Sequence, residues 1–152
     1  MEKIVSERSI IPACTGRKGE LLALWEQSVR TTHTFLKEAD IKALFPFVSE
    51  ALEKVGRLLC ICNEAGQAEA FMGVDGDKLE MLFVHPLSRG KGIGKVLVRH
   101  AIQNLGVCYV DVNEQNLLAL GFYQYMGFRV YDRSALDGQG NPFPILHMKL
   151  KK

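Results

Sequence analysis

Residues 79–97 read LEMLFVHPLSRGKGIGKVL, and the rest of the chain is organised around this stretch. Leu79 to Val84 is a short apolar run closed by Pro86, which is typical of a buried strand. From Ile93 onward the apolar positions repeat with the period of one helix face. They are Ile93, Val96, Leu97, Ala101 and Leu105. The stretch therefore predicts a strand, a tight turn and a helix.

Three glycines at alternate positions, Gly90, Gly92 and Gly94, separate the strand from the helix. A turn so poor in side chains allows backbone N–H groups at a helix N-terminus to approach an anion closely, and the helix dipole adds to the attraction. Arg89, Lys91 and Lys95 contribute positive charge. The turn predicts a phosphate or pyrophosphate site; the alternative is a glycine-rich turn that binds no ligand.

Two familiar phosphate motifs do not fit this turn. The P-loop requires Ser or Thr after its Gly-Lys pair, whereas Val96 follows Lys95. The dinucleotide motif requires a third glycine where this chain has Lys95 or Leu97. The pattern Arg89-x-x-Gly92-x-Gly94 instead resembles the pyrophosphate loop of the GNAT acyltransferases. In that family the loop follows the fourth strand and holds the pyrophosphate of acetyl-coenzyme A.

Composition excludes several classes of protein. The 152 residues suit a single domain, 1–152, with a sizeable core, and 47% hydrophobic with 24% charged residues is ordinary for a globular protein. The net charge of +2 without a long basic run gives no indication of nucleic-acid binding. No apolar stretch is long enough to span a membrane, and residues 1–8 lack a signal-peptide core, so we expect no membrane association and a cytoplasmic location. The four cysteines form no CxxC pair and are interpreted as reduced thiols.

Periodicity and turn residues predict the remaining elements. We expect strands at 9–14, 57–63, 68–74, 78–84, 107–112, 128–131 and 145–150, and helices at 18–29, 92–105 and 116–126. Asp40 is expected to cap a short helix that Pro46 breaks, with a second helix to Val55. Residues 33–46 would then be a hinged, broken helix pair, and such segments often form a lid or specificity wall. This order predicts an α/β fold with a mixed sheet.

A second motif lies downstream, in residues 113–128, NEQNLLALGFYQYMGF. It resembles the other GNAT signature, Asn-x-x-Ala-x-x-Phe-Tyr followed by Gly-Phe. The matching residues are Asn116, Ala119, Phe122, Tyr123, Gly127 and Phe128. Asn116 and Tyr123 lie seven residues apart, about 20° from eclipsed on a helix, so they share one face. Leu118, Phe122 and Met126 are expected to form the core stripe of this helix.

Because both motifs are present and occur in this order, the chain is identified as a member of the GNAT superfamily. Residues 24–36, 113–116 and 142–144 resemble a small bacterial group within it. The resemblance implies a single-domain GNAT-like fold, a mixed, mostly antiparallel twisted sheet with helices on both faces. It also implies transfer of acetyl from acetyl-coenzyme A to an amine by direct attack, with no metal.

The resemblance also implies the site residues. Cofactor contacts are expected at Leu82, Phe83, Val84, Arg89, Gly90, Lys91, Gly92, Ile93, Gly94, Lys95, Asn116, Ala119 and Tyr123. Among them, Leu82 is the first choice for the thioester carbonyl, Asn116 can hydrogen-bond a pantetheine amide, and Tyr123 can protonate the departing thiolate. The acceptor is expected to meet His33, Phe35 and Glu80. Candidates for the base are Glu80, His33, His85 and His147.

Two functional hypotheses other than an enzyme remain open. One is a catalytically weak sensor or interaction protein that binds coenzyme A or acetyl-coenzyme A, and the other is a phosphate-binding module unrelated to acyl transfer. The acceptor, an amine of a small molecule or peptide, is not named by the sequence. A monomer and a homodimer are both compatible with it.

Overall fold

The computed structural model describes residues 9–13 and 15–151, and in these residues seven strands form one mixed sheet. The strands are β1 (Ile10–Pro12), β2 (Arg57–Cys62), β3 (Ala68–Asp75), β4 (Lys78–Val84), β5 (Tyr109–Asn113), β6 (Phe128–Ser134) and β7 (Ile145–Leu150). The helices are α1 (Lys18–Thr32), α2 (Glu38–Lys54), α3 (Ile93–Asn104) and α4 (Leu117–Tyr125), with short 3-10 turns η2 (Thr15–Arg17) and η3 (Pro86–Ser88). The predicted order of elements is confirmed. The first strand is shorter than expected, and Cys14 lies outside the described residues.

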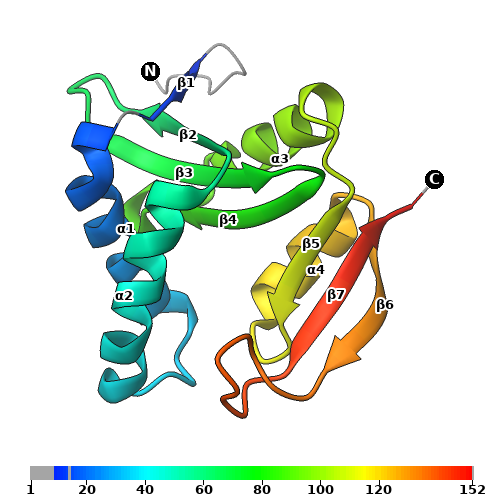
Figure 1. Ribbon diagram of the computed structural model, residues 1–152. Coiled ribbons are helices and arrows are strands. Elements are labelled where there is room, and N and C mark those ends of the chain that lie inside the picture. Colours follow the sequence, from blue (N-terminus) through cyan, green and yellow to red (C-terminus); the bar gives the residue numbers. More distant parts are fainter. Residues whose placement is uncertain (1–8, 14, 152) are drawn as a thin grey trace.

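Helices cover both faces of the sheet, as Figure 1 shows. On β3, Ala70, Met72 and Val74 point into one core, which they share with α3 and α4, whereas Phe71 points into another core with α1 and α2. Side chains along a strand alternate between its two faces, so an unbroken apolar strand is stable only where both faces are covered. The predicted fold class is therefore confirmed.

The sheet divides between β4 and β5. The strand order is β1-β2-β3-β4-β5-β7-β6, and β4–β5 is the one parallel pair among these strands. That pair consists of Lys78 opposite Tyr109 and Leu79 opposite Val110 only. Beyond Leu79 the two strands diverge, which Figure 1 shows as a wedge between β4 and β5. The wedge leaves backbone groups of β4 without a strand partner on that side.

Pro46 does not break the second helix, so the predicted broken pair is wrong. α2 runs unbroken from Glu38 to Lys54 with Pro46 inside it. A proline there leaves the carbonyl of Lys42 without its helical partner and costs about 3 kcal/mol. The helix continues because its apolar stripe packs on α1 along its whole length. This stripe consists of Ile41, Leu44, Val48 and Leu52.

The non-helical connection between the two helices is therefore short, residues 33–37. Asp40 does not precede a helix but lies in its first turn, where its carboxylate accepts a hydrogen bond from the backbone N–H of Lys37 at 2.8 Å. Arg30 at the end of α1 donates to both carboxylate oxygens of Glu38, at 2.6 and 2.9 Å. These contacts fix where the chain leaves α1 and where it enters α2.

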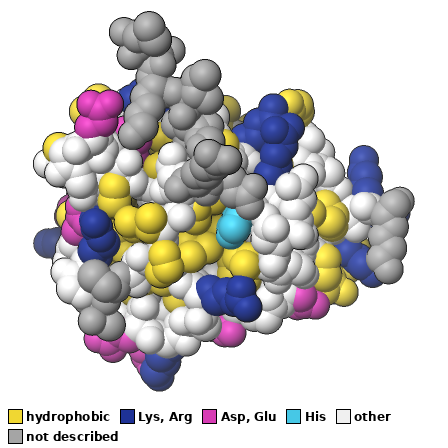
Figure 2. Space-filling view, turned by 90° about the horizontal axis from the view of Figure 1, so that it is seen from above, with side chains coloured by type: hydrophobic (Ala, Val, Ile, Leu, Met, Phe, Trp, Pro, Cys, Tyr) yellow, Lys and Arg dark blue, Asp and Glu magenta, His cyan; other side chains and the backbone are white. Residues whose placement is uncertain are grey.

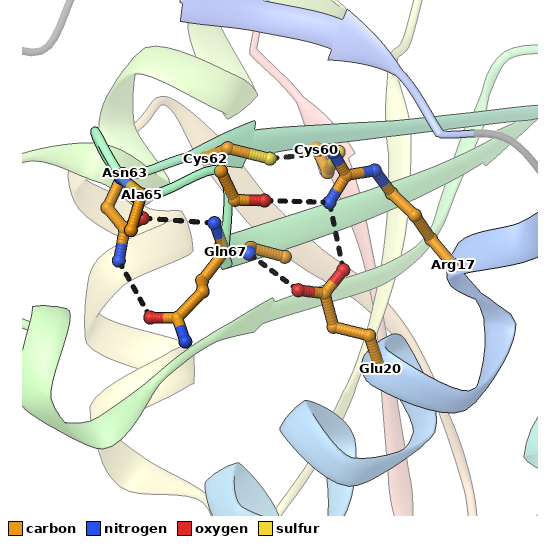
Figure 3. A network of polar contacts seen from close by, with 9 residues as sticks. Arg17, Glu20, Cys60, Cys62, Asn63, Ala65 and Gln67 are labelled. Atoms are coloured by element: carbon orange, nitrogen blue, oxygen red, sulfur yellow. Dashed lines mark hydrogen bonds and ion pairs between the residues drawn. The ribbon is translucent and has the colours of Figure 1, made fainter.

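A polar network ties the start of α1 to the β2–β3 hairpin (Figure 3). Arg17 donates to Glu20 at 2.9 Å and to the carbonyl of Gly66 at 3.2 Å, and Glu20 accepts from the N–H of Ala68 at 3.0 Å. Asn63 accepts two backbone hydrogen bonds inside the turn. These hydrogen bonds hold the hairpin against α1. They help to position the start of α1 on the sheet.

Figure 2 shows Lys and Arg side chains in separate groups across the face seen there, not as the continuous basic stripe of a nucleic-acid surface. Within residues 9–13 and 15–151, no helix is both long and apolar enough to cross a bilayer.

Candidate active site

The glycine turn leaves the start of α3 open. Gly90 and Gly92 have φ of +80° and +78°, in the left-handed region that side chains disfavour. Gly92 is the N-cap of α3, and no side chain caps the first helical turn. A Cβ on Gly92 would meet nothing within 4 Å. The first turn of α3 is therefore uncapped by side chains and has room beside Gly92 for a ligand, as an anion site at a helix start requires.

Hydrogen bonds fix the conformation of the segment that leads into the turn. The N–H of His85 donates to the carbonyl of Glu69 at 2.7 Å, and His85 Nδ1 accepts from the N–H of Leu87 at 3.1 Å. The hydroxyl of Ser88, which is buried, donates to Glu69 Oε1 at 3.4 Å. His85 is thus a structural cap of η3, and its Nδ1 is already engaged.

Each basic residue of the turn has a protein contact. Arg89 donates to Ser28 of α1 at 3.4 Å, and Lys95 donates to the hydroxyl of Tyr125 at 3.0 Å. Lys91 lies 3.8 Å from Glu69. These contacts hold three cations around the helix start while leaving each one able to share its charge with an anion.

A cavity of about 330 Å³ extends from this turn along α4. It is within the size range of ligand pockets. All the predicted cofactor residues line it except Lys91. Sequence reasoning missed five more lining residues: Ser28, Thr32, Ser88, Leu118 and Phe122. Leu118 was expected in the core, but it is 76% exposed, because this face of α4 borders the cavity and Tyr123 takes the buried position.

Tyr123 lies at the inner end of that face. Its side chain is 7% exposed, and its ring packs edge-on against Phe122 and Phe128, with centroid distances of 5.2 and 5.9 Å. Burial raises the pKa of Tyr123 above its ordinary value, so the hydroxyl keeps its proton. A protonated hydroxyl at a cavity wall can donate a hydrogen bond or a proton to a bound group.

Asn116 and His33 close the cavity on the side of α1. Asn116 is the N-cap of α4, where its Oδ1 accepts from the N–H of Ala119 at 3.2 Å, and its Nδ2 contacts His33 Nε2 at 3.3 Å. Because an amide nitrogen can only donate, His33 Nε2 accepts, and its Nδ1 carries the proton and faces the hydroxyl of Thr32 at 2.9 Å. Burial, and secondarily Arg89, lower the pKa of His33 to about 4. His33 is thus neutral and a weak base.

A second, smaller cavity of about 120 Å³ lies in the wedge between β4 and β5. The two cavities share Leu82, Phe83, Ala119 and Tyr123, together with the Asn116–His33 pair. The second cavity also has two acidic walls, Glu80 and Asp111. A group bound in the first cavity and another entering through the second would meet beside Leu82 and Tyr123.

The predicted acceptor residues lie around this second cavity, but not all of them line it. Glu80 lines it, at a bulge in β4 where the register to β3 shifts. Phe35 lines neither cavity; its ring packs against His33 at 5.4 Å and against Phe143 of the β6–β7 connection at 5.9 Å. Asp111 was not singled out from the sequence, although a carboxylate between Val110 and Val112 in a strand was the available signal.

Comparison with known proteins indicates the family of the chain. The sequence model of the acetyltransferase (GNAT) domain matches residues 53–130. The chain is 39% identical over 129 residues to peptidyl-lysine N-acetyltransferase YjaB of Salmonella typhimurium, covering 85% of this chain and 88% of that protein. Its fold is similar to the solution structure of apo-form YjaB from Escherichia coli, with a TM-score of 0.85, 37% identity, and coverage of 93% of this chain and 96% of that one. The bacterial group expected from the sequence is therefore confirmed.

A more distant structure shows the fold alone. This is the PaiA N-acetyltransferase of Thermoplasma acidophilum in complex with coenzyme A, with a TM-score of 0.70 and 19% identity. It covers 93% of this chain, and the match covers 98% of that chain.

Proposed function

The chain belongs to the GNAT acetyltransferase family and is an acetyl-coenzyme A-dependent N-acetyltransferase, and we propose that its acceptor is a lysine side chain in a peptide or protein. The observation that carries the proposal is the second cavity, because it opens onto Leu82 and Tyr123 between two carboxylates, Glu80 and Asp111. A cationic amine is the acceptor that such walls favour. The YjaB relatives, which carry the name peptidyl-lysine N-acetyltransferase, support the same choice.

For the cofactor, we propose that its pyrophosphate lies on the backbone of residues 89–94 and its pantetheine arm along α4. Arg89, Lys91 and Lys95 would supply charge to the phosphates, and Ala119 leaves room for the arm beside the helix backbone. Both polar ends of Asn116 already have protein partners, so its contact to a pantetheine amide would replace the one to His33.

In the reaction that we propose, the acceptor ammonium first gives one proton to solvent water at the opening of the second cavity, and its neutral nitrogen then attacks the thioester carbonyl directly. The carbonyl oxygen gains negative charge and is stabilised by backbone N–H groups of β4 near Leu82, since β4 lacks a strand partner there. The bond to sulfur then breaks and Tyr123 gives its proton to the thiolate, while the extra proton on the new amide nitrogen returns to the Tyr123 oxygen. Burial raises the pKa of Tyr123, and burial in the same cavity would also raise the pKa of the leaving thiol, so the two pKa values shift in the same direction.

The test is an acceptor panel under saturating acetyl-coenzyme A, with thiol release as the readout. The panel holds a peptide with one lysine, the same peptide with norleucine in its place, free amino acids, polyamines and small amines. We expect the highest kcat/KM on the lysine peptide and no turnover on the norleucine control. Higher kcat/KM on a small amine would contradict the lysine proposal. Tight cofactor binding without turnover on any amine would favour the sensor reading.

A further inference from the structure

A chain of hydrogen bonds crosses four neighbouring strands beside the second cavity. Lys78 of β4 donates to Asp111 Oδ2 of β5 at 2.7 Å. Asp111 Oδ1 lies 2.7 Å from Nδ1 of His147 of β7, and His147 Nε2 lies 2.7 Å from the hydroxyl of Ser134 of β6. Glu80 lies at the near end of this chain, 4.0 Å from the ammonium of Lys78.

The protons of the cluster follow from its partners. Burial alone would raise the pKa of Asp111, but hydrogen bonds from Lys78 and His147 outweigh it and the pKa is lowered, so the group is a carboxylate. A carboxylate only accepts, hence His147 Nδ1 donates to it, and His147 Nε2 contacts the hydroxyl of Ser134. Asp111 is therefore held as an anion from two sides.

The Ser134–His147–Asp111 order is also that of a hydrolase nucleophile, but its surroundings differ. Ser134 is the last residue of β6, where it pairs with Ile145 at the end of the β6–β7 ladder, and it does not stand at a strand-to-helix turn whose N–H groups could stabilise an oxyanion. Of the three, only Asp111 lines the cavity shared with Leu82 and Tyr123. The cluster thus presents a fixed negative charge to whatever enters that cavity.

We propose that Asp111 and Glu80 form the binding site for the acceptor's ammonium group, and that Lys78 is a resident competitor for it. This inference rests on the proposed function. The ammonium of Lys78 is the same chemical group as that of an acceptor lysine, with three donors and no acceptor. It contacts Asp111 at 2.7 Å and lies 4.0 Å from Glu80.

The contact is weak enough to be exchanged. The side chains of Lys78, Asp111 and Glu80 are 35%, 32% and 41% exposed, and ion pairs this accessible hold little free energy. An arriving ammonium can therefore share or take over the carboxylate. The bound acceptor gives its proton to solvent water only afterwards, before attack, so the two carboxylates act mainly on the KM for the acceptor.

The test compares two variants with opposite expected signs, on the lysine peptide at saturating acetyl-coenzyme A. Asp111→Asn keeps the shape and removes the charge, and should raise the peptide KM about three- to tenfold. Lys78→Met removes the competitor and should lower the KM about two- to fivefold. The matched control is Lys149→Met, which removes a charge from β7 that contacts the Tyr109 ring at 5.9 Å, and should leave the KM unchanged.

A purely structural role for the cluster predicts another result, because both variants would then lose thermal stability while the KM stays at the wild-type value. That result, or a raised KM in Lys78→Met, overturns the inference. If the wild type acetylates no lysine peptide, the proposed function fails by itself. Calorimetric binding of n-butylammonium to the enzyme–coenzyme A complex then decides the inference: tighter binding in Lys78→Met supports it, and equal binding in all variants contradicts it.

Discussion

The two sides of the β4–β5 wedge are built from different parts of the chain. At the proposed phosphate end of the cofactor cavity the contacts are mainly backbone, from the positive-φ glycines of the turn and the first turn of α3, all within residues 84–97. On the acceptor side the surface is formed by side chains from separate elements, among them Glu80 of β4, Asp111 of β5 and His33 at the end of α1. A ligand whose structure does not vary, such as pyrophosphate, can be recognised by a short backbone motif. An acceptor is recognised by side chains that several helices and strands bring together.

Tyr123 is the residue at which the two sides meet, so its replacement gives the largest expected effect. Tyr123→Phe keeps the packing against Phe122 and Phe128 and removes one hydroxyl. A positioned general acid contributes about 10²–10⁴-fold, so kcat should fall by that factor while acetyl-coenzyme A affinity stays near wild type. Steady-state kinetics and calorimetry measure both.

Two outcomes would change the role of Tyr123. A kcat within a few-fold of wild type, with chemistry rate-limiting, means that water or another group supplies the proton. If the affinity for acetyl-coenzyme A and kcat fall together, the hydroxyl helps to bind the cofactor and is not the acid.

The backbone character of the cofactor side can be tested with two matched glycines. Gly92 and Gly66 have φ of +78° and +81°, and a Cβ on either meets nothing within 4 Å. Gly92→Val and Gly66→Val should therefore lose similar unfolding free energy, about 1–2 kcal/mol. Only Gly92→Val should lose acetyl-coenzyme A affinity, about tenfold or more, as phosphate hydrogen bonds are lost. Equal affinities in the two variants would place the pyrophosphate elsewhere.

His33, which borders both cavities, should make stability depend on pH. Burial, then Arg89, lower its pKa from 6.5 to about 4. The unfolded chain binds the proton first, so the stability contribution is complete above pH 6.5 and is lost as the pH falls toward 4, at most about 3 kcal/mol. Urea unfolding of wild type and His33→Gln across this range measures it. If the free energy of unfolding changes with pH equally in both proteins, His33 is not held neutral in the folded state.

Pro46 gives the smallest expected effect, and one confined to the helix pair above the acceptor side. Its ring costs α2 a hydrogen bond, so Pro46→Ala should raise the unfolding free energy by about 1–3 kcal/mol. Acetyl-coenzyme A affinity should not change. An unchanged midpoint in thermal unfolding would show that packing on α1 already compensates for the proline.

The division of the site explains what could be predicted from the sequence. Strand ends, the glycine turn and the Asn116–Tyr123 face are local patterns, so their positions agree with the structure to within a few residues. The acceptor side has no such pattern. Asp111 and His147 are 36 residues apart and meet only because β5 pairs with β7.

Two expectations failed because tertiary packing overrode a local rule. Pro46 reads as a helix break, but the stripe from Ile41 to Leu52 packs on α1 and the helix continues. Leu118 reads as core by helix period, but α4 borders a cavity on that face, and the buried residue is Tyr123. In both cases the deciding partner lies in another part of the chain.

The most direct test of the two-sided site is the initial-velocity pattern of the wild-type enzyme, with acetyl-coenzyme A and the lysine peptide both varied. If cofactor and acceptor are bound together and the amine attacks the thioester directly, double-reciprocal lines intersect. The account also predicts that no acetylated enzyme forms when acetyl-coenzyme A is given alone. Parallel lines, together with an acetyl-enzyme that transfers its group to the peptide, would contradict it.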